Sequence, residues 1–129
     1  MVLSDILTAK QQTVLQSYLH DDWRLMILNG AVRSGKTFID NWLFLMEIRR
    51  IAKLAKKDGI KKPLYILAGF SSNSIYNNVI SSIRNQFGID LKPDRHGHFH
   101  WMNVEIVPSY TGTERGVNSV RGLTAMGAY

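Results

Sequence analysis

The chain has 129 residues, a length that predicts one domain of ordinary size. Hydrophobic residues make up 45% of it and charged residues 20%, which is a globular composition and excludes a disordered tail or a collagen-like repeat. The absence of cysteine excludes a disulfide framework, a thiolate metal site and a cysteine nucleophile. The net charge of +6 suits a polyanionic partner such as nucleic acid, although solubility alone also accounts for it.

No apolar run reaches the roughly 20 residues needed to cross a bilayer. The segment Met1 to Asp5 lacks the basic and apolar start of a signal peptide. We therefore expect an intracellular, cytoplasmic protein without membrane contact.

The first third of the chain predicts a helix, a strand and a second helix. Thr8 and Gln11 form a capping-box pattern, which opens a helix that ends near residues 20–22. The apolar face of this helix combines Leu15, Tyr18 and Leu19. The short apolar run 25–28 predicts a buried strand.

A long helix follows, from about Lys36 to Lys57, with Gly59 as its expected C-cap. Its apolar stripe repeats at steps of four, three and four residues, through Phe44, Ile48, Ile51 and Ala55. The remaining expected elements are a strand at 64–69, a helix from Ser71 or Ser72 to about Phe87, a turn and loop at 88–98, one or two strands at 99–107 broken near Asn103, a loop at 111–118 and a final apolar segment at 123–129. Strands that alternate with long helices predict an α/β protein with a mainly parallel sheet flanked by helices.

Residues 30–37 match the pattern G-x-x-x-x-G-K-[ST], which is typical of P-loop NTPases. Glycines let successive backbone N–H groups turn toward phosphate oxygens, and the N-terminus of the following helix favours the same anion. Lys36 is expected to reach the β- and γ-phosphates, and the Thr37 hydroxyl is expected to ligate Mg²⁺. The predicted ATP-binding residues are Gly30, Ala31, Val32, Arg33, Ser34, Gly35, Lys36 and Thr37.

The run Arg33–Thr37, preceded by Leu28-Asn29-Gly30, resembles the phosphate loop of the large terminase subunits of tailed phages. Leu7–Gln11 looks like the glutamine motif that contacts adenine in that family, and Leu64–Gly69 looks like the second strand and its motif. Arg121–Tyr129 is similar to the run that leads into the family's second nucleotide motif. The resemblance covers essentially the whole chain, but only the first part of the family's ATPase domain.

The resemblance implies an ATPase motor that uses ATP and Mg²⁺ to package double-stranded viral DNA into a capsid. It also implies a portal and a small terminase subunit as partners, association of several copies of the chain, and a place in the bacterial cytoplasm, transiently at the procapsid. Residues 1–129 would then be a partial P-loop ATPase domain without the nuclease domain.

The sequence given stops at Tyr129, where the family's Asp-Glu pair would begin. Because phosphoryl transfer needs a metal clamp and an oriented water as well as a phosphate cradle, we expect weak nucleotide binding without turnover, and we assign no catalytic residue. The alternatives are another P-loop NTPase or kinase, and a non-enzymatic prophage remnant.

Several residues carry two interpretations each. Gln11 is either the adenine-contacting residue or only a capping residue, with Gln12 as a substitute candidate. Arg33 either reaches the γ-phosphate or is a solvated loop arginine. Arg121 lies in the run that resembles the segment before the family's second nucleotide motif, so it is a candidate for contacts with nucleotide or DNA.

Two charged clusters also remain open. Lys53, Lys56 and Lys57, with Lys61 and Lys62 nearby, are candidates for DNA backbone contacts or simply a solvated helix end. His96, His98 and His100 alternate in a way that would place them on one strand face, as in a zinc site. No carboxylate or cysteine completes an obvious ligand set in the sequence, so a solvated hairpin face is the default expectation.

Overall fold

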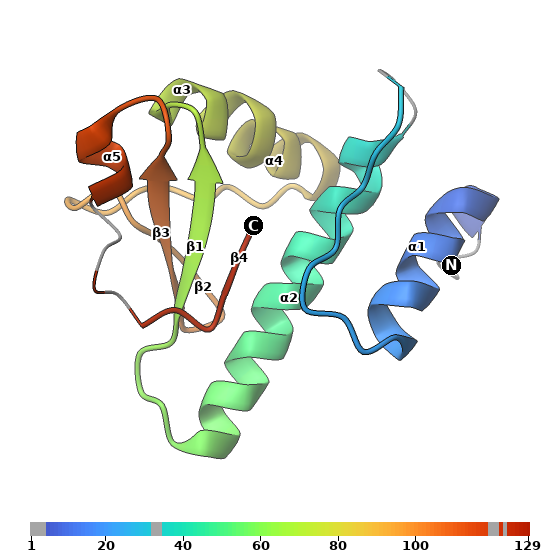
Figure 1. Cartoon of the computed structure of the whole chain (residues 1–129), viewed down its shortest axis with the longest axis horizontal. Helices are drawn as coiled ribbons and strands as arrows, with labels where there is room; N and C mark the ends of the chain where they lie inside the picture. The colour runs from blue at the N-terminus through green and yellow to red at the C-terminus, as the bar shows by residue number, and fades with distance from the viewer. Residues whose placement is uncertain (1–4, 32–34, 119–121, 123) are drawn as a thin grey trace. The chain divides into compact units, whose positions relative to one another are not determined.

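The computed structural model describes residues 5–31, 35–118, 122 and 124–129. It divides into two compact units, Met1–Phe44 and Leu45–Tyr129, with the boundary inside the long helix. Each unit is described by itself below (Figure 1).

The first unit opens with α1 (Ala9–His20). The predicted capping box is confirmed: the Gln11 backbone N–H donates to the Thr8 hydroxyl and the Thr8 N–H donates to the Gln11 side chain. The predicted apolar face is only partly buried, because Leu15 is 7% exposed whereas Leu19 is 51% exposed. Because only one leucine of this helix is closely packed, the caps contribute much of the stabilisation of its ends.

The predicted strand at residues 25–28 is wrong. These described residues have no regular secondary structure, and the side chains of Leu25 and Ile27 are both 77% exposed. A strand is stabilised by hydrogen bonds to a neighbouring strand, and the described part of residues 1–44 contains none to pair with it. The apolar composition of the run was therefore an insufficient signal.

The predicted long helix is confirmed as α2 (Lys36–Asp58). All four members of the predicted apolar stripe are at most 2% exposed: Phe44, Ile48, Ile51 and Ala55. Gly59 follows the helix at φ +73°, and the Ile60 N–H donates to the Ala55 carbonyl at 2.8 Å. This hydrogen bond, from an N–H to the carbonyl five residues earlier, belongs to a Schellman-type C-cap. A glycine with positive φ permits that motif.

The described residues of the second unit form a four-stranded sheet in the order β2-β3-β1-β4. β1 (Leu64–Gly69) is parallel to both β3 (Val104–Tyr110) and β4 (Gly127–Ala128), while β2 (Phe99–Trp101) is antiparallel to β3. The protein is therefore α/β with a mixed, mostly parallel sheet flanked by helices (Figure 1).

One continuous helical run follows β1, at the place where a helix to Phe87 was predicted. It consists of α3 (Ser72–Ile75), a π-helical turn η2 (Tyr76–Ile80) and α4 (Ser81–Phe87). Ser71 caps its start by accepting a hydrogen bond from the Ser74 N–H at 3.2 Å, and Gly88 ends it at φ +71°. The buried apolar side of the run comprises Ile75, Ile80 and Ile83.

The centre of the sheet supplies much of the core of the second unit. Leu67 of β1 and Val104 and Ile106 of β3 have no exposed surface. β1 is hydrogen-bonded on both sides, and its alternate residues Tyr65 and Leu67 are buried, so one face of the strand belongs to the core.

A two-residue turn joins β2 to β3 and confirms the predicted break near Asn103. Met102 (φ +51°) and Asn103 (φ +63°) both lie in the left-handed region. Positive φ at both central residues matches the twist of a hairpin, and asparagine accepts that conformation more readily than methionine does.

Met102→Asn is therefore expected to raise the free energy of unfolding by about 0.5–1 kcal/mol, because it relieves strain at an exposed position. Urea denaturation measures the change. Met102→Val is the control and is expected to lower stability, since a β-branched residue at positive φ is less favourable still. A Met102→Asn protein less stable than wild type would contradict this account.

The predicted loop at 111–118 is wrong over its second half, where α5 (Glu114–Asn118) forms. The loop residues before it continue the strand pairing, because the Thr111 N–H donates to the Gly69 carbonyl at 2.8 Å. The polar, glycine-containing composition of these residues gave no signal for this short helix, which follows directly after the end of β3.

Among the helices in the described part of the chain, none has both the length and the apolar character that a bilayer crossing requires.

Candidate phosphate-binding site

The described part of the predicted phosphate loop comprises Gly30, Ala31, Gly35, Lys36 and Thr37; Val32, Arg33 and Ser34 lie outside the described residues. Gly30 and Ala31 are exposed and precede the start of α2. Gly35 has φ +85°, and the helix begins at the next residue. The chain therefore makes a glycine-dependent turn directly into the N-terminus of a 23-residue helix, as the motif predicts.

The Lys36 side chain folds back over the loop. Its ammonium donates to the Ala31 carbonyl at 2.7 Å and also to the Gly30 carbonyl. A cation held against this segment, next to the N-terminus of a helix, gives the local electrostatics of an anion site.

Gln11 connects α1 to this turn. Its side-chain Nε2 donates to the Gly35 carbonyl at 3.0 Å, while its Oε1 accepts from the Thr8 N–H at 2.8 Å. A Cβ atom at Gly35 would lie 2.7 Å from the same Nε2. The capping role is thus confirmed, contact with adenine stays a prediction, and the link to Gly35 is a positioning role that local sequence did not reveal.

The first turns of α2 carry a hydroxyl and a carboxylate near Lys36. Thr37 is exposed at the second position of the helix, so its hydroxyl is accessible to a metal. Partial burial raises the pKa of Asp40 above its ordinary value, and the Lys36 charge opposes that shift. The site therefore combines one close cation with a carboxyl group whose charged form is disfavoured by desolvation.

The lysines predicted as DNA contacts lie on the second half of α2, in the second unit. Lys53 and Lys56 line an open groove of about 640 Å³ together with Arg49 and Lys61. Lys57 is exposed on the same helix, and Arg121 lies outside the described residues. Arg49 was not predicted, although its helical spacing of four and seven residues from Lys53 and Lys56 could have identified it.

The alternating histidines do not all lie in one strand. His96 lies in the turn before β2, whereas only His100 is within the strand and His98 directly precedes it. The expectation that no carboxylate accompanies them is wrong, because Asp94 and Glu105 lie within 2.7 Å of His100 and His98, respectively. The hairpin register, which sequence spacing did not disclose, brings Glu105 opposite His100.

Comparison of the chain with protein-family models, with curated proteins and with solved structures gives no match in any of the three.

Proposed function

We propose that the loop of residues 30–37 binds the phosphates of Mg²⁺-ATP. The observation that carries this proposal is the Lys36 ammonium lying on the loop carbonyls at the N-terminus of α2, directly after a glycine at φ +85°. On ATP binding, Lys36 exchanges these neutral carbonyls for the β- and γ-phosphate oxygens, which form stronger, charge-assisted hydrogen bonds. The first N–H groups of α2 and the Thr37 hydroxyl then complete the phosphate and Mg²⁺ contacts.

Mg²⁺-ATP titration of the purified chain by calorimetry tests the proposal. Lys36→Ala is expected to weaken ATP binding at least about tenfold, because the charge-assisted bonds to phosphate are lost. Lys57→Ala removes an exposed lysine from the last turn of the same helix and is expected to leave the affinity unchanged. Equal ATP affinity for the wild-type and Lys36→Ala chains, with folding verified by circular dichroism, would overturn the assignment.

We further propose that this ATP site belongs to a motor ATPase of the terminase large-subunit kind, which translocates double-stranded DNA in the cytoplasm of a bacterial host and at the procapsid. The support is the family resemblance in the phosphate loop and the flanking stretches, together with the basic groove around Lys53 and Lys56. Closely spaced cations are the groups that contact a DNA backbone. Portal, small subunit and further copies of the chain are the partners that this role entails.

A further inference from the structure

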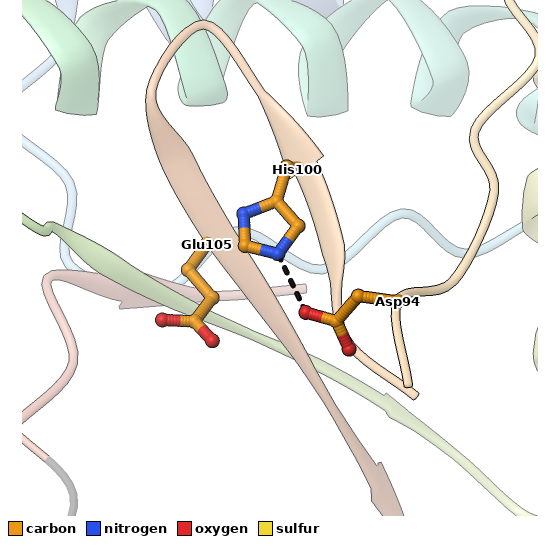
Figure 2. Close-up of side chains that lie close together, drawn as sticks. All are labelled: Asp94, His100 and Glu105. Carbon is orange, nitrogen blue, oxygen red and sulfur yellow. Dashed lines mark hydrogen bonds and ion pairs between the residues drawn. The ribbon is translucent and has the colours of Figure 1, made fainter. Parts of the chain in front are cut away.

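A mixed cluster of one histidine and two carboxylates lies on the β2–β3 hairpin. It belongs to the second unit, whereas the proposed phosphate loop belongs to the first. Asp94 comes from the loop before β2, His100 from β2 and Glu105 from β3 (Figure 2). The ligand atoms that these side chains offer all lie within 4.8 Å of one another. His100 and Glu105 are direct cross-strand partners, which is why their side chains project from the same face.

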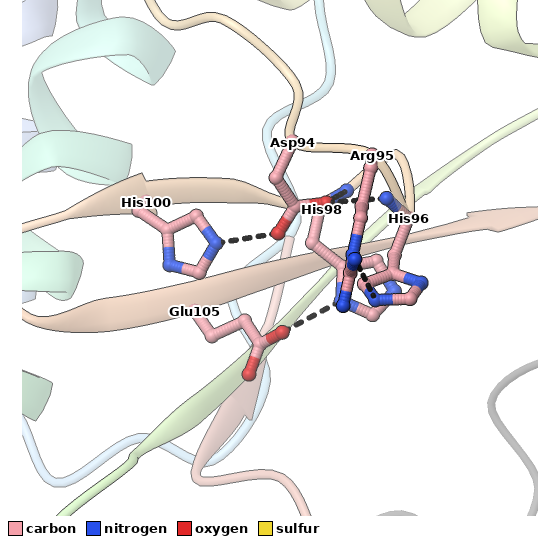
Figure 3. Close-up of polar contacts among 6 residues, drawn as sticks. All are labelled: Asp94, Arg95, His96, His98, His100 and Glu105. Atoms are coloured by element: carbon pink, nitrogen blue, oxygen red, sulfur yellow. Dashed lines mark hydrogen bonds and ion pairs between the residues drawn. The ribbon is translucent and has the colours of Figure 1, made fainter.

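The Asp94 carboxylate is held in place by the backbone of its own turn. Its Oδ1 accepts hydrogen bonds from the N–H groups of His96 at 2.8 Å and His98 at 3.0 Å (Figure 3). Its Oδ2 lies 2.7 Å from His100 Nε2. The contact with His100 and the two backbone bonds therefore fix the orientation of the Asp94 carboxylate.

Glu105 is oriented by a second histidine. His98 Nδ1 lies 2.7 Å from Glu105 Oε1 (Figure 3). Carboxylates and imidazoles that bind metals are typically oriented in this way by a further hydrogen-bonding group. His98 is therefore a positioning residue for Glu105 rather than a member of the three-residue set.

We propose that Asp94, His100 and Glu105 form a binding site for a divalent transition metal, with Zn²⁺ as the ion that fits best. Zn²⁺ takes nitrogen and oxygen ligands at about 2.0–2.2 Å in tetrahedral geometry, which separates ligand atoms by roughly 3.3 Å. In the present structure His100 Nε2 and Asp94 Oδ2 are 2.7 Å apart, and all three ligand atoms lie within 4.8 Å of one another. These separations bracket the tetrahedral value.

The charge and exposure of the cluster suit an ion that arrives from solvent. The charges of two carboxylates offset that of a divalent cation, and with the imidazole nitrogen they leave a fourth position for water. The His100 side chain is 54% exposed and that of Asp94 is 31% exposed, so the ion has a direct entry path. An imidazole ligand favours Zn²⁺ over Mg²⁺, which prefers oxygen ligands alone.

Calorimetric titration of the untagged full-length chain with ZnCl₂, after removal of metal by a chelator and without nucleotide, tests the site. We expect one Zn²⁺ per chain with affinity in the micromolar range or tighter, and no displacement by millimolar Mg²⁺. His100→Ala and Glu105→Gln should each weaken Zn²⁺ binding about 10–100-fold.

Two histidine variants serve as matched controls. His96→Ala keeps the backbone N–H that holds Asp94, and His20→Ala lies in the first unit, so both should retain wild-type Zn²⁺ affinity. Circular dichroism verifies that each variant is folded. The proposal is overturned if the wild-type chain binds Zn²⁺ only at millimolar concentration, if His100→Ala binds as wild type does, or if His20→Ala or His96→Ala loses the ion instead.

Discussion

Replacing Gly35 with alanine is expected to weaken Mg²⁺-ATP binding at least about tenfold, because the loop that the proposed site requires can no longer close in its present form. An L-residue at φ +85° costs about 1–2 kcal/mol in backbone energy. The added Cβ would also lie 2.7 Å from Gln11 Nε2, so either the loop or the side chain that fixes it must move. Calorimetric titration with Mg²⁺-ATP measures the loss.

Gly59→Ala is a matched control for the backbone cost. Gly59 has φ +73°, and a Cβ built there would meet nothing within 4 Å. Its substitution should lower stability without changing ATP affinity. Comparing a double variant, Gly35→Ala with Gln11→Ala, against Gln11→Ala alone isolates the steric part of the effect, since both lack the group that the new methyl would meet. Wild-type ATP affinity in Gly35→Ala, or an equal loss in Gly59→Ala, would contradict the prediction.

Leu67→Ala is expected to lower the free energy of unfolding by about 2–5 kcal/mol, a large share of the roughly 5–15 kcal/mol that a domain commonly has. Leu67 has no exposed surface and lies in β1, the strand bonded on both sides. The substitution removes buried methyl groups and leaves a cavity in the packed core. Urea denaturation followed by circular dichroism gives the change in midpoint.

The same substitution at Leu25 provides the comparison. Because Leu25 is 77% exposed, Leu25→Ala should change stability by no more than about 0.5 kcal/mol. The pair also tests the corrected status of residues 25–28. If Leu25→Ala were as costly as Leu67→Ala, the run would be buried after all, as its apolar composition first indicated.

Local signals predicted the features that depend on neighbours along the chain. The predictions of the capping box at Thr8 and Gln11, of a serine cap at Ser71 or Ser72 (it is Ser71) and of the glycine after α2 are confirmed, because a cap is made by residues three to five positions apart. The break near Asn103 was correct for the same reason.

The errors arose where a contact crosses long stretches of sequence. Residues 25–28 have the composition of a strand, but a strand exists only where another strand supplies its hydrogen bonds. The polar run before Asn118 was assigned to a loop although its second half forms α5. In both cases composition alone misled the prediction, because it does not report which neighbouring segments a stretch of chain packs or pairs with.

The sequence by itself determined the phosphate-loop motif, the long helix that follows it and the succession of β1 and the helical run after it. These depend on residue spacing and backbone preference, which are local properties. Only the tertiary structure decided that Gln11 bonds to Gly35, 24 residues away, and that Glu105 faces His100 across the hairpin. Strand register and packing set those distances, and they are fixed by the simultaneous burial of many side chains rather than by any one stretch of the chain.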